Sequence, residues 1–600
     1  MQKVRIAIAL VLLTCSALGL RLWGIGAMLP ERVEPDTQIV QQAAIFRGDA
    51  PPDGRTLGAY PHLLGRILSI LPARTTSARL DVDHLEEHLA VASSELLRGR
   101  KLSAWLSVLA IPGTYFLARR WLSPAAALLC AFLISASMLA FVFAQQARPH
   151  AAFTSFSLLA TVAALRARER GDALSWTLYG AALCLALCCL HTGAFLLPMG
   201  LMAAWLGPRH ATRRWWHALA ATAVALGIAL ATCYPFLFAP VESEVTKLGQ
   251  SVSGRFPHVV LFDRFDGGGF LKLWHAMGSY DPWLRWLALF GAVAVLYGAI
   301  AWWRNAEQRA AALVMLSFAL PYGLVIGIYT GSFERFLLPL FPALAVLCVA
   351  GTQLAAHGLA RAARTPIVAP CALGALLLLL IVPFFVVVKL ARLRAMPNTL
   401  AAAAAWLASK HPQGDATLLV HGGLTLPMAT IRSSVEARGV LDAVFPPYWN
   451  AYVARQVLDE NFKAGWQTRP LGKRELDGLS DRSGPAELQR VRNVVLSRRA
   501  DYLVIRAVSN APETAILLSA LADDAALVAR FPDPEGGQSA WGLDLWQPDF
   551  WFSAWRAQAS GPALEIHRLG TRQRFKSLEP DRAGAGDEPA SDEARDVSDD

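Results

Sequence analysis

Three short segments of the sequence place ionisable side chains next to long apolar runs. The first, LPERVEPDTQIVQQA, carries Glu34 and Asp36 shortly after an apolar stretch at the N-terminus. A carboxylate at that position could act as a general base towards a hydroxyl group, and the like charge of Glu34 would raise the pKa of Asp36. The structural alternative is that Asp36 caps a helix that begins at Thr37.

The second segment, AQQARPHAAF at 144–153, places Arg148 immediately before a proline. Pro149 is well suited to the first turn of a helix, so Arg148 would be a cation at a helix N-terminus, where the helix dipole disfavours it. A bound anion nearby would compensate for this. The alternative is that Arg148 extends to lipid headgroups.

The third segment, TGSFERFLLPLFPALAVL, carries Glu334 and Arg335 at the start of another apolar run. These two residues could form an ion pair with each other, or Arg335 could contact a phosphate, which the planar guanidinium group suits. Tyr60 and His62, in GAYPHLLGRIL, are weaker candidates for substrate binding.

The elements that must position these residues are predominantly membrane helices. Of the 600 residues, 54% are hydrophobic and 17% are charged, whereas soluble proteins are about 25% charged. A span needs about 20 apolar residues. We therefore predict about eleven transmembrane helices, at 6–23, 101–117, 124–143, 151–165, 176–190, 191–206, 217–237, 283–303, 310–328, 336–355 and 365–388.

Arginine residues are distributed unequally between the two sets of short loops. With the N-terminus inside, most of them fall in cytoplasmic loops, which is the bias that orients membrane proteins. The short outside connections hold only Arg148 and Arg335. An odd number of helices then places the C-terminal portion outside. This pattern predicts a multi-pass protein of a bacterial-type plasma (inner) membrane, with a cytoplasmic N-terminus and a periplasmic or extracytoplasmic C-terminal domain.

The chain divides into a membrane module at 1–390, an α/β domain at 391–570 and an acidic, disordered tail at 571–600. Two large outside loops, at 24–100 and 239–282, belong to the membrane module. Within the first loop, the spacing of Leu85, Leu89 and Leu96 predicts a separate amphipathic helix on the membrane surface. In the C-terminal domain we predict strands in ATLLVHGG, DYLVIRA and PALEIHRL, and one helix over PETAILLSALADDAALVARF. All eight cysteines lie in apolar runs, which excludes a disulfide framework in the C-terminal portion.

Taken together, these segments resemble the GT-C superfamily of glycosyltransferases, of the type that uses polyprenyl-phosphate sugars, which includes protein O-mannosyltransferases and aminoarabinose transferases. RLWGIG…LP…EPDTQ resembles the first loop of that family, YPHLLGRIL its Pro-Pro-Leu-like element, QQARPHAAFTSFSLLA its Arg-Pro-Tyr-Ala helix start, and ERFLLPLFPALAVL its Arg-Tyr-x-x-Pro-x-x-Pro helix. NTLAAAAAWLASKHPQGD and GPALEIHRL resemble the start and end of its extracytoplasmic domain.

This resemblance implies a GT-C-like polytopic fold and an enzyme that moves a sugar from a polyprenyl phosphate to an extracytoplasmic acceptor, with inversion and with Asp36 as the general base. The acceptor would be lipopolysaccharide or another lipid, a polysaccharide or a protein. Glu34, Tyr60, His62, Arg148, His150 and Arg335 would bind the substrates. The lipid-linked sugar is a substrate, no cofactor is implied, and neither a divalent metal nor nucleic acid is indicated.

This chain departs from the family pattern at four positions, which affects the identity of the sugar more than the class of reaction. Thr37 follows Asp36 where the family usually has Glu. Tyr60 stands in place of the Lys of aminoarabinose transferases. His62 stands where many members have a second Pro, and His150 where many have Tyr.

Two other classes of protein remain as alternatives. A transporter or lipid flippase would carry ionisable residues or broken helices near the bilayer midplane, whereas the helix interiors here are nearly free of charge. A non-catalytic envelope assembly protein would work through its outer α/β domain and would not depend on Asp36.

Overall fold

The computed structural model describes residues 2–27, 29, 38–49, 54–71, 85–207, 214–234, 264–303, 305–365, 367–412, 414, 416–421, 426, 430–431, 457–458, 466–471, 484–507, 512–532 and 549–570. Asp36 and Glu34 therefore lie outside the described residues. So do the predicted acidic tail and the part of the second large loop from residue 239 to residue 263.

The N-terminal two thirds of the described chain is helical. The α-helices of this portion are α1 (Gln2–Leu22), α2 (Gln38–Arg47), α3 (Gly54–Ala59), α4 (Leu63–Ile70), α5 (Leu85–Ser107), α6 (Ala110–Ala118), α7 (Pro124–Ala136), α8 (Met138–Ala144), α9 (His150–Arg170), α10 (Ala173–Cys189), α11 (Leu197–Trp205), α12 (Arg214–Cys233), α13 (Gly268–Tyr280), α14 (Pro282–Trp303), α15 (Ala306–Ile328), α16 (Phe341–Ala363) and α17 (Val368–Arg394). Two 3₁₀ helices, η2 (His191–Leu196) and η5 (Glu334–Leu340), precede α11 and α16.

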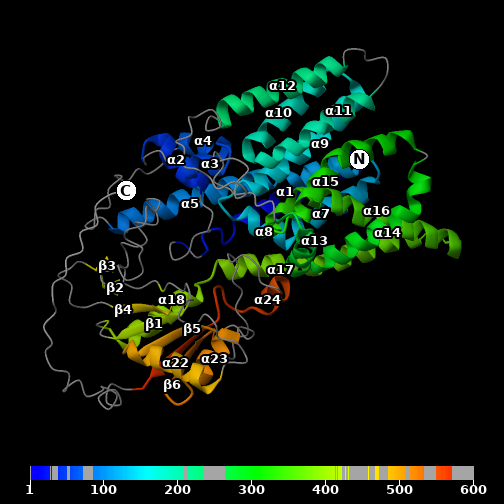
Figure 1. Ribbon diagram of the computed structural model, residues 1–600. Coiled ribbons are helices and arrows are strands. Elements are labelled where there is room, and N and C mark those ends of the chain that lie inside the picture. Colours follow the sequence, from blue (N-terminus) through cyan, green and yellow to red (C-terminus); the bar gives the residue numbers. More distant parts are fainter. Residues whose placement is uncertain are drawn as a thin grey trace, which may run out of the picture.

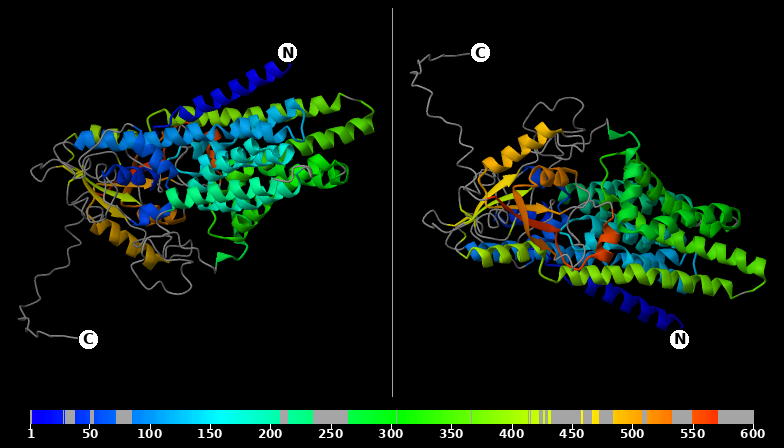
Figure 2. Two further views of the ribbon diagram at one scale, coloured as in Figure 1. Left: turned by 90° about the horizontal axis from the view of Figure 1, so that it is seen from above. Right: turned by 90° about the horizontal axis from the view of Figure 1, so that it is seen from below.

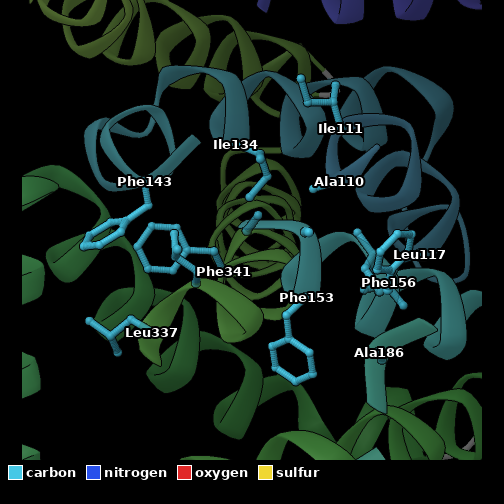
Figure 3. Packing of buried hydrophobic residues seen from close by; sticks show 14 of the residues in the cluster. Ala110, Ile111, Leu117, Ile134, Phe143, Phe153, Phe156, Ala186, Leu337 and Phe341 are labelled. Atoms are coloured by element: carbon cyan, nitrogen blue, oxygen red, sulfur yellow. The ribbon is translucent and has the colours of Figure 1, made fainter. Parts of the chain in front are cut away.

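The long helices form one bundle, which Figure 1 shows beside a smaller sheet-containing domain. Phe143, Phe153 and Phe341, from three different helices, pack in the interior of the bundle (Figure 3). α1 lies on the outside of the bundle in both views of Figure 2. At one end of the bundle, α1 and α8 end and α9 begins. This end lies towards the sheet-containing domain, and we call it the sheet end.

Each of the eleven predicted apolar segments contains a helix, but the number of spans is not confirmed. Within the described residues, six helices are long and apolar enough to cross a membrane, or seven if the bent pair α7 and α8 counts as one span. α9 is long enough, but its first half contains several polar residues and its last five residues include three arginines. The chain is therefore a multi-pass membrane protein, without a fixed count of eleven.

The helix predicted around Leu89 is present, as the first part of a longer helix. α5 runs without a break from Leu85 to Ser107, so the predicted surface helix and the start of the next predicted span form one helix. Gly99 lies at the point of closest approach. A Cβ atom there would be 2.9 Å from the Cβ atom of Ala147 and 3.1 Å from a methyl carbon of Val40. The sequence therefore allows α5 to contact both α2 and the connection between α8 and α9.

The C-terminal domain is a three-layer α/β sandwich. Its helices are α18 (Thr399–Lys410), α22 (Pro485–Ser497), α23 (Pro512–Ala520) and α24 (Phe550–Arg556). Its strands are β1 (Thr417–His421), β2 (Thr430–Ile431), β3 (Val457–Leu458), β4 (Gln467–Leu471), β5 (Tyr502–Arg506), β6 (Ala525–Phe531) and β7 (Leu564–Leu569). The main sheet has the order β4-β1-β5-β7-β6. β1 is parallel to β4 and to β5, whereas β7 is antiparallel to β5 and to β6.

Alternation along the strands explains the two helical layers. In β1, Leu418 and Val420 face α18, while Leu419 faces α22 and α23, because successive side chains of a strand point to opposite faces. The three predicted strands are confirmed. The single predicted helix over 512–531 is wrong in its second half. α23 ends at Ala520 and the chain continues as the edge strand β6, because pairing with β7 outweighs the helix preference of its alanines.

A buried carboxylate holds the break between α7 and α8. These two helices meet at an angle of 58°. Asp281 has no exposed surface. Its carboxylate accepts hydrogen bonds from the Ser137 hydroxyl at 2.8 Å, the Met138 amide at 2.8 Å and the Leu139 amide at 3.2 Å. The amides in the first turn of α8 have no acceptor within that helix. Asp281, at the junction of α13 and α14, accepts their hydrogen bonds instead.

We expect Asp281→Ala to lower the stability of the protein. The substitution leaves two buried amides without an acceptor, and each such loss costs about 1–3 kcal/mol. The midpoint of thermal unfolding of the purified protein in detergent measures the effect. Asp281→Asn, which keeps one acceptor oxygen, should fall between the wild type and Asp281→Ala. Equal midpoints for all three proteins would contradict this role.

Candidate functional site

Three of the residues predicted from the sequence come together at the sheet end. Arg335, in η5, donates a hydrogen bond from Nε to Nε2 of His150, the first residue of α9, at 3.2 Å. The ring of Tyr60, just after α3, lies edge-on to the ring of His150 with 6.0 Å between centroids. Residues that are 185 positions apart in the chain are thus joined directly.

Aromatic rings support both members of this pair. The Arg335 guanidinium carbon lies 4.2 Å from the centre of the Phe333 ring and 5.5 Å from that of Phe336. The His150 ring lies 5.7 Å from that of Phe336. Because a guanidinium group is attracted to the face of an aromatic ring, these contacts restrict the directions in which Arg335 can point. Arg335 contacts His150 here, rather than forming the alternative ion pair with Glu334.

Arg148 is buried at the same connection. Only 1% of its surface is exposed, so the alternative that it extends into lipid headgroups does not hold. Its backbone carbonyl accepts a hydrogen bond from the Ser103 hydroxyl of α5 at 3.1 Å. α9 begins two residues later. A buried arginine therefore stands two residues before a helix N-terminus, and a helix N-terminus favours an anion.

The contacts of His62 hold the surrounding backbone in place. Its Nε2 lies 2.8 Å from the Leu57 carbonyl, and its ring lies edge-on to that of Phe46 at 5.1 Å. Its amide donates to the carbonyl of Cys233 at the end of α12. Burial lowers the pKa of His62. The structure thus gives His62 contacts that hold the turn between α3 and α4.

Sequence reasoning missed Gln42. This fully buried residue of α2 donates hydrogen bonds from Nε2 to the carbonyl of Thr56 at 3.1 Å and to that of Tyr60 at 2.8 Å. It therefore fixes the backbone of Tyr60. The pair Gln41–Gln42 lies in the same segment as Asp36, but a glutamine gives no recognisable signal in one sequence.

A second set of polar contacts holds the chain where it leaves α1. Arg100, fully buried in α5, donates to the carbonyls of Ile25 at 2.8 Å and Ala27 at 2.9 Å. Gln145 donates to the carbonyls of Arg21 at 3.0 Å and Trp23 at 2.8 Å. Arg394, at the end of α17, donates in turn to Gln145. The start of the first large loop is thus attached to the connection that carries Arg148.

The described residues contain no group of three or more His, Cys, Asp or Glu side chains arranged to hold a metal ion. Asp36 and Glu34 are not among the residues to which this statement applies. What the described part of the site offers chemically is positive charge, an oriented imidazole and aromatic surface.

Residues 88–238 match the sequence model of the dolichyl-phosphate-mannose-protein mannosyltransferase family. This segment includes Arg148 and His150. No curated protein matches the sequence.

Solved structures of three glycosyltransferases are similar at low identity. The oligosaccharyltransferase of Archaeoglobus fulgidus, tethered to an acceptor peptide, has a TM-score of 0.42 and 13% identity, covering 88% of this chain and 73% of its own. ArnT of Cupriavidus metallidurans, bound to undecaprenyl phosphate, has a TM-score of 0.43 and 12% identity, covering 93% and 97%. The arabinofuranosyltransferase AftD from Mycobacteria has a TM-score of 0.34 and 15% identity, covering 94% and 41%.

TM-scores below 0.5 do not establish a shared fold. The match of residues 88–238 to the mannosyltransferase family model agrees with the resemblance found in the sequence motifs.

Proposed function

We propose that this protein transfers a sugar from a polyprenyl-phosphate carrier to an acceptor hydroxyl at the sheet end of the bundle, with inversion at the anomeric carbon. Asp36 acts as the general base. Arg148 and Arg335 bind the phosphate of the donor, and Glu34, Tyr60 and His150 complete the substrate site.

One observation carries this proposal. The hydrogen bond from Arg335 to His150, with Tyr60 against the imidazole ring, joins three motifs that the sequence separates widely. All three belong to the set that resembles the polyprenyl-phosphate-dependent family. A single site that uses them together therefore explains why they occur in one chain.

The charges present support a phosphate ligand. Arg148 precedes His150 by two residues in the sequence, and Arg335 is hydrogen-bonded to His150, at which α9 begins. The leaving group of the transfer is a lipid phosphate, whose negative charge grows as the bond from the anomeric carbon to the phosphate oxygen breaks. Guanidinium groups already in place would stabilise that charge.

The chain on both sides of Asp36 supports its assignment as the base. Before it, the carbonyl of Ala27 is bound to Arg100. After it, Gln42 is bound to the carbonyl of Tyr60. In the proposed step, Asp36 takes the proton of the acceptor hydroxyl while the acceptor oxygen forms its bond to the anomeric carbon.

The loop charges support the proposed orientation. Arginines concentrate in the loops that would be cytoplasmic, so we place the site and the C-terminal domain on the extracytoplasmic side of a bacterial-type inner membrane. The acceptor would be lipopolysaccharide or another lipid, a polysaccharide or a protein. A transporter or flippase remains the second candidate, without a described feature that favours it.

We expect Asp36→Asn to abolish most of the sugar transfer. Removing a general base typically lowers a rate by about 10²–10⁴-fold. The assay measures the sugars on cell-surface lipids and glycans by mass spectrometry after complementation of a deletion strain, with the amount of protein in the membrane measured in parallel.

Asp49→Asn is the matched control for this experiment. Asp49 is a carboxylate of the same loop, but it is paired with Arg47 at 2.7 Å, so its loss should leave transfer nearly unchanged. Full activity of Asp36→Asn at normal protein levels would refute the catalytic assignment and would favour an assembly role.

We expect Arg335→Gln to weaken binding of the lipid phosphate. Hydrogen bonds to charged groups contribute about 1.5–3 kcal/mol, so the dissociation constant for undecaprenyl phosphate should rise roughly 10- to 100-fold. Titration of the purified protein in nanodiscs measures it. Arg530→Gln, in strand β6 where Arg530 pairs with Glu565, should bind like the wild type. Equal affinity of both variants would count against a phosphate site at Arg335.

We also propose that transfer needs no divalent metal, because the sequence shows no obvious cluster of acidic residues at the site. Activity should persist in the presence of EDTA. Loss of activity on chelation, with recovery on adding Mg²⁺ or Mn²⁺, would show that this part of the proposal is wrong.

A further inference from the structure

The short helix α24 leaves the C-terminal sheet and packs on the membrane bundle. In the sequence it lies between β6 and β7, which are neighbours in the sheet. In space it lies against α17, at the boundary between the sheet domain and the bundle (Figure 1). Its sequence, FWFSAWR, contains four aromatic residues among seven.

One face of α24 is buried against protein. The ring of Phe550 stacks on that of Tyr280 at the end of α13, with 4.7 Å between centroids and 27° between planes. The Phe550 amide donates to the Ser279 hydroxyl at 3.2 Å. Ala554 and Ala557, which follow at helical spacing, have no exposed surface. These contacts attach α24 firmly to the bundle.

The other face of α24 is aromatic and exposed. Phe552 is 44% exposed and Trp555 is 48% exposed. The ring of Trp551 stacks on that of Trp555, with 5.9 Å between centroids and 9° between planes. Arg556, also exposed, adds a positive charge beside them. Burial against protein therefore does not explain why this face is aromatic.

Helix α17 shows at which depth in the membrane this face lies. The side chain of Lys389 donates a hydrogen bond to the carbonyl of Trp555. Residues 366–388 contain no charged side chain, whereas Lys389, Arg392 and Arg394 follow closely one after another. Phe385, one turn before Lys389, is 61% exposed, as expected of a side chain that faces lipid. Trp555 is therefore bound at the level at which α17 changes from apolar to basic.

We propose that the exposed face of α24, formed by Phe552, Trp555 and Arg556, is an anchor that inserts into the lipid headgroup region at the sheet end of the bundle. Tryptophan and other amphipathic aromatic residues are favoured at the boundary between hydrocarbon and water. Arg556 and Lys389 can reach anionic headgroups from there. The C-terminal domain is then held by lipid as well as by protein, which sets its height above the bundle.

Photo-crosslinking in a bilayer tests this proposal. The photoreactive residue p-benzoylphenylalanine replaces Phe552 or Trp555 in the full-length protein, which is reconstituted in nanodiscs of phosphatidylethanolamine and phosphatidylglycerol and irradiated. We expect covalent lipid adducts at both positions, detected by mass spectrometry of the peptide that contains 549–557.

Leu527 is the matched control position. It is 48% exposed and lies in the same domain on the edge strand β6, away from the bundle in Figure 1. The photoreactive residue at Leu527 should give no lipid adducts above background. Equal yields at Leu527 and Phe552, or no adducts at Phe552 and Trp555, would overturn the proposal.

A second measurement does not depend on crosslinking. The double variant Phe552→Ser/Trp555→Ser keeps the buried contacts of Phe550, so the protein should still fold. In nanodiscs, amide hydrogen exchange of 549–557 should be faster in this variant than in the wild type. In detergent micelles without lipid headgroups, the two proteins should differ less. The same exchange rates for both proteins in nanodiscs would contradict a lipid anchor.

Discussion

Backbone that leaves a helix inside a membrane module needs hydrogen-bond partners from the protein, because lipid hydrocarbon supplies none. At several points of the sheet end, the backbone leaves a helix and a buried polar side chain forms hydrogen bonds with it. Arg100 donates hydrogen bonds to the carbonyls of Ile25 and Ala27. Gln145 donates to those of Arg21 and Trp23. The carboxylate of Asp281 accepts hydrogen bonds from the amides at the start of α8. The arrangement of the candidate site depends on these contacts.

The same contacts explain how widely separated motifs meet. Arg148 and His150 lie in the connection from α8 to α9, and the angle at which α8 leaves α7 is held by Asp281. Tyr60 is fixed through its backbone by Gln42. Arg335 lies in a 3₁₀ helix, where its guanidinium group is restricted by two phenylalanine rings and by His150. A site built in this way presents its cations in directions set before a ligand arrives, which is what stabilisation of a developing charge requires.

Much of the fold could be predicted because its signals are local. Long uncharged runs indicated the membrane helices, and short apolar stretches indicated β1, β5 and β7. The errors arose where contacts distant in sequence decide the structure. The segment 525–531 is rich in alanine and suits a helix, yet it pairs with β7 as a strand. The helix predicted around Leu89 continues through Gly99 into the next predicted span, and the missing side chain of Gly99 allows close packing against Ala147 and Val40.

For the candidate site, the sequence by itself determined which residue types are available: a carboxylate at position 36, guanidinium groups at 148 and 335, and an imidazole at 150, each next to an apolar run. The order of its motifs also carries the resemblance to the GT-C superfamily. Only the tertiary structure decided that Arg335 bonds to His150, that Arg148 is buried rather than at the headgroups, and that His62 holds a turn instead of joining His150. The physical reason is that hydrogen bonds and ring contacts depend on distances of a few ångströms between segments far apart in the chain, and one sequence carries no record of those distances.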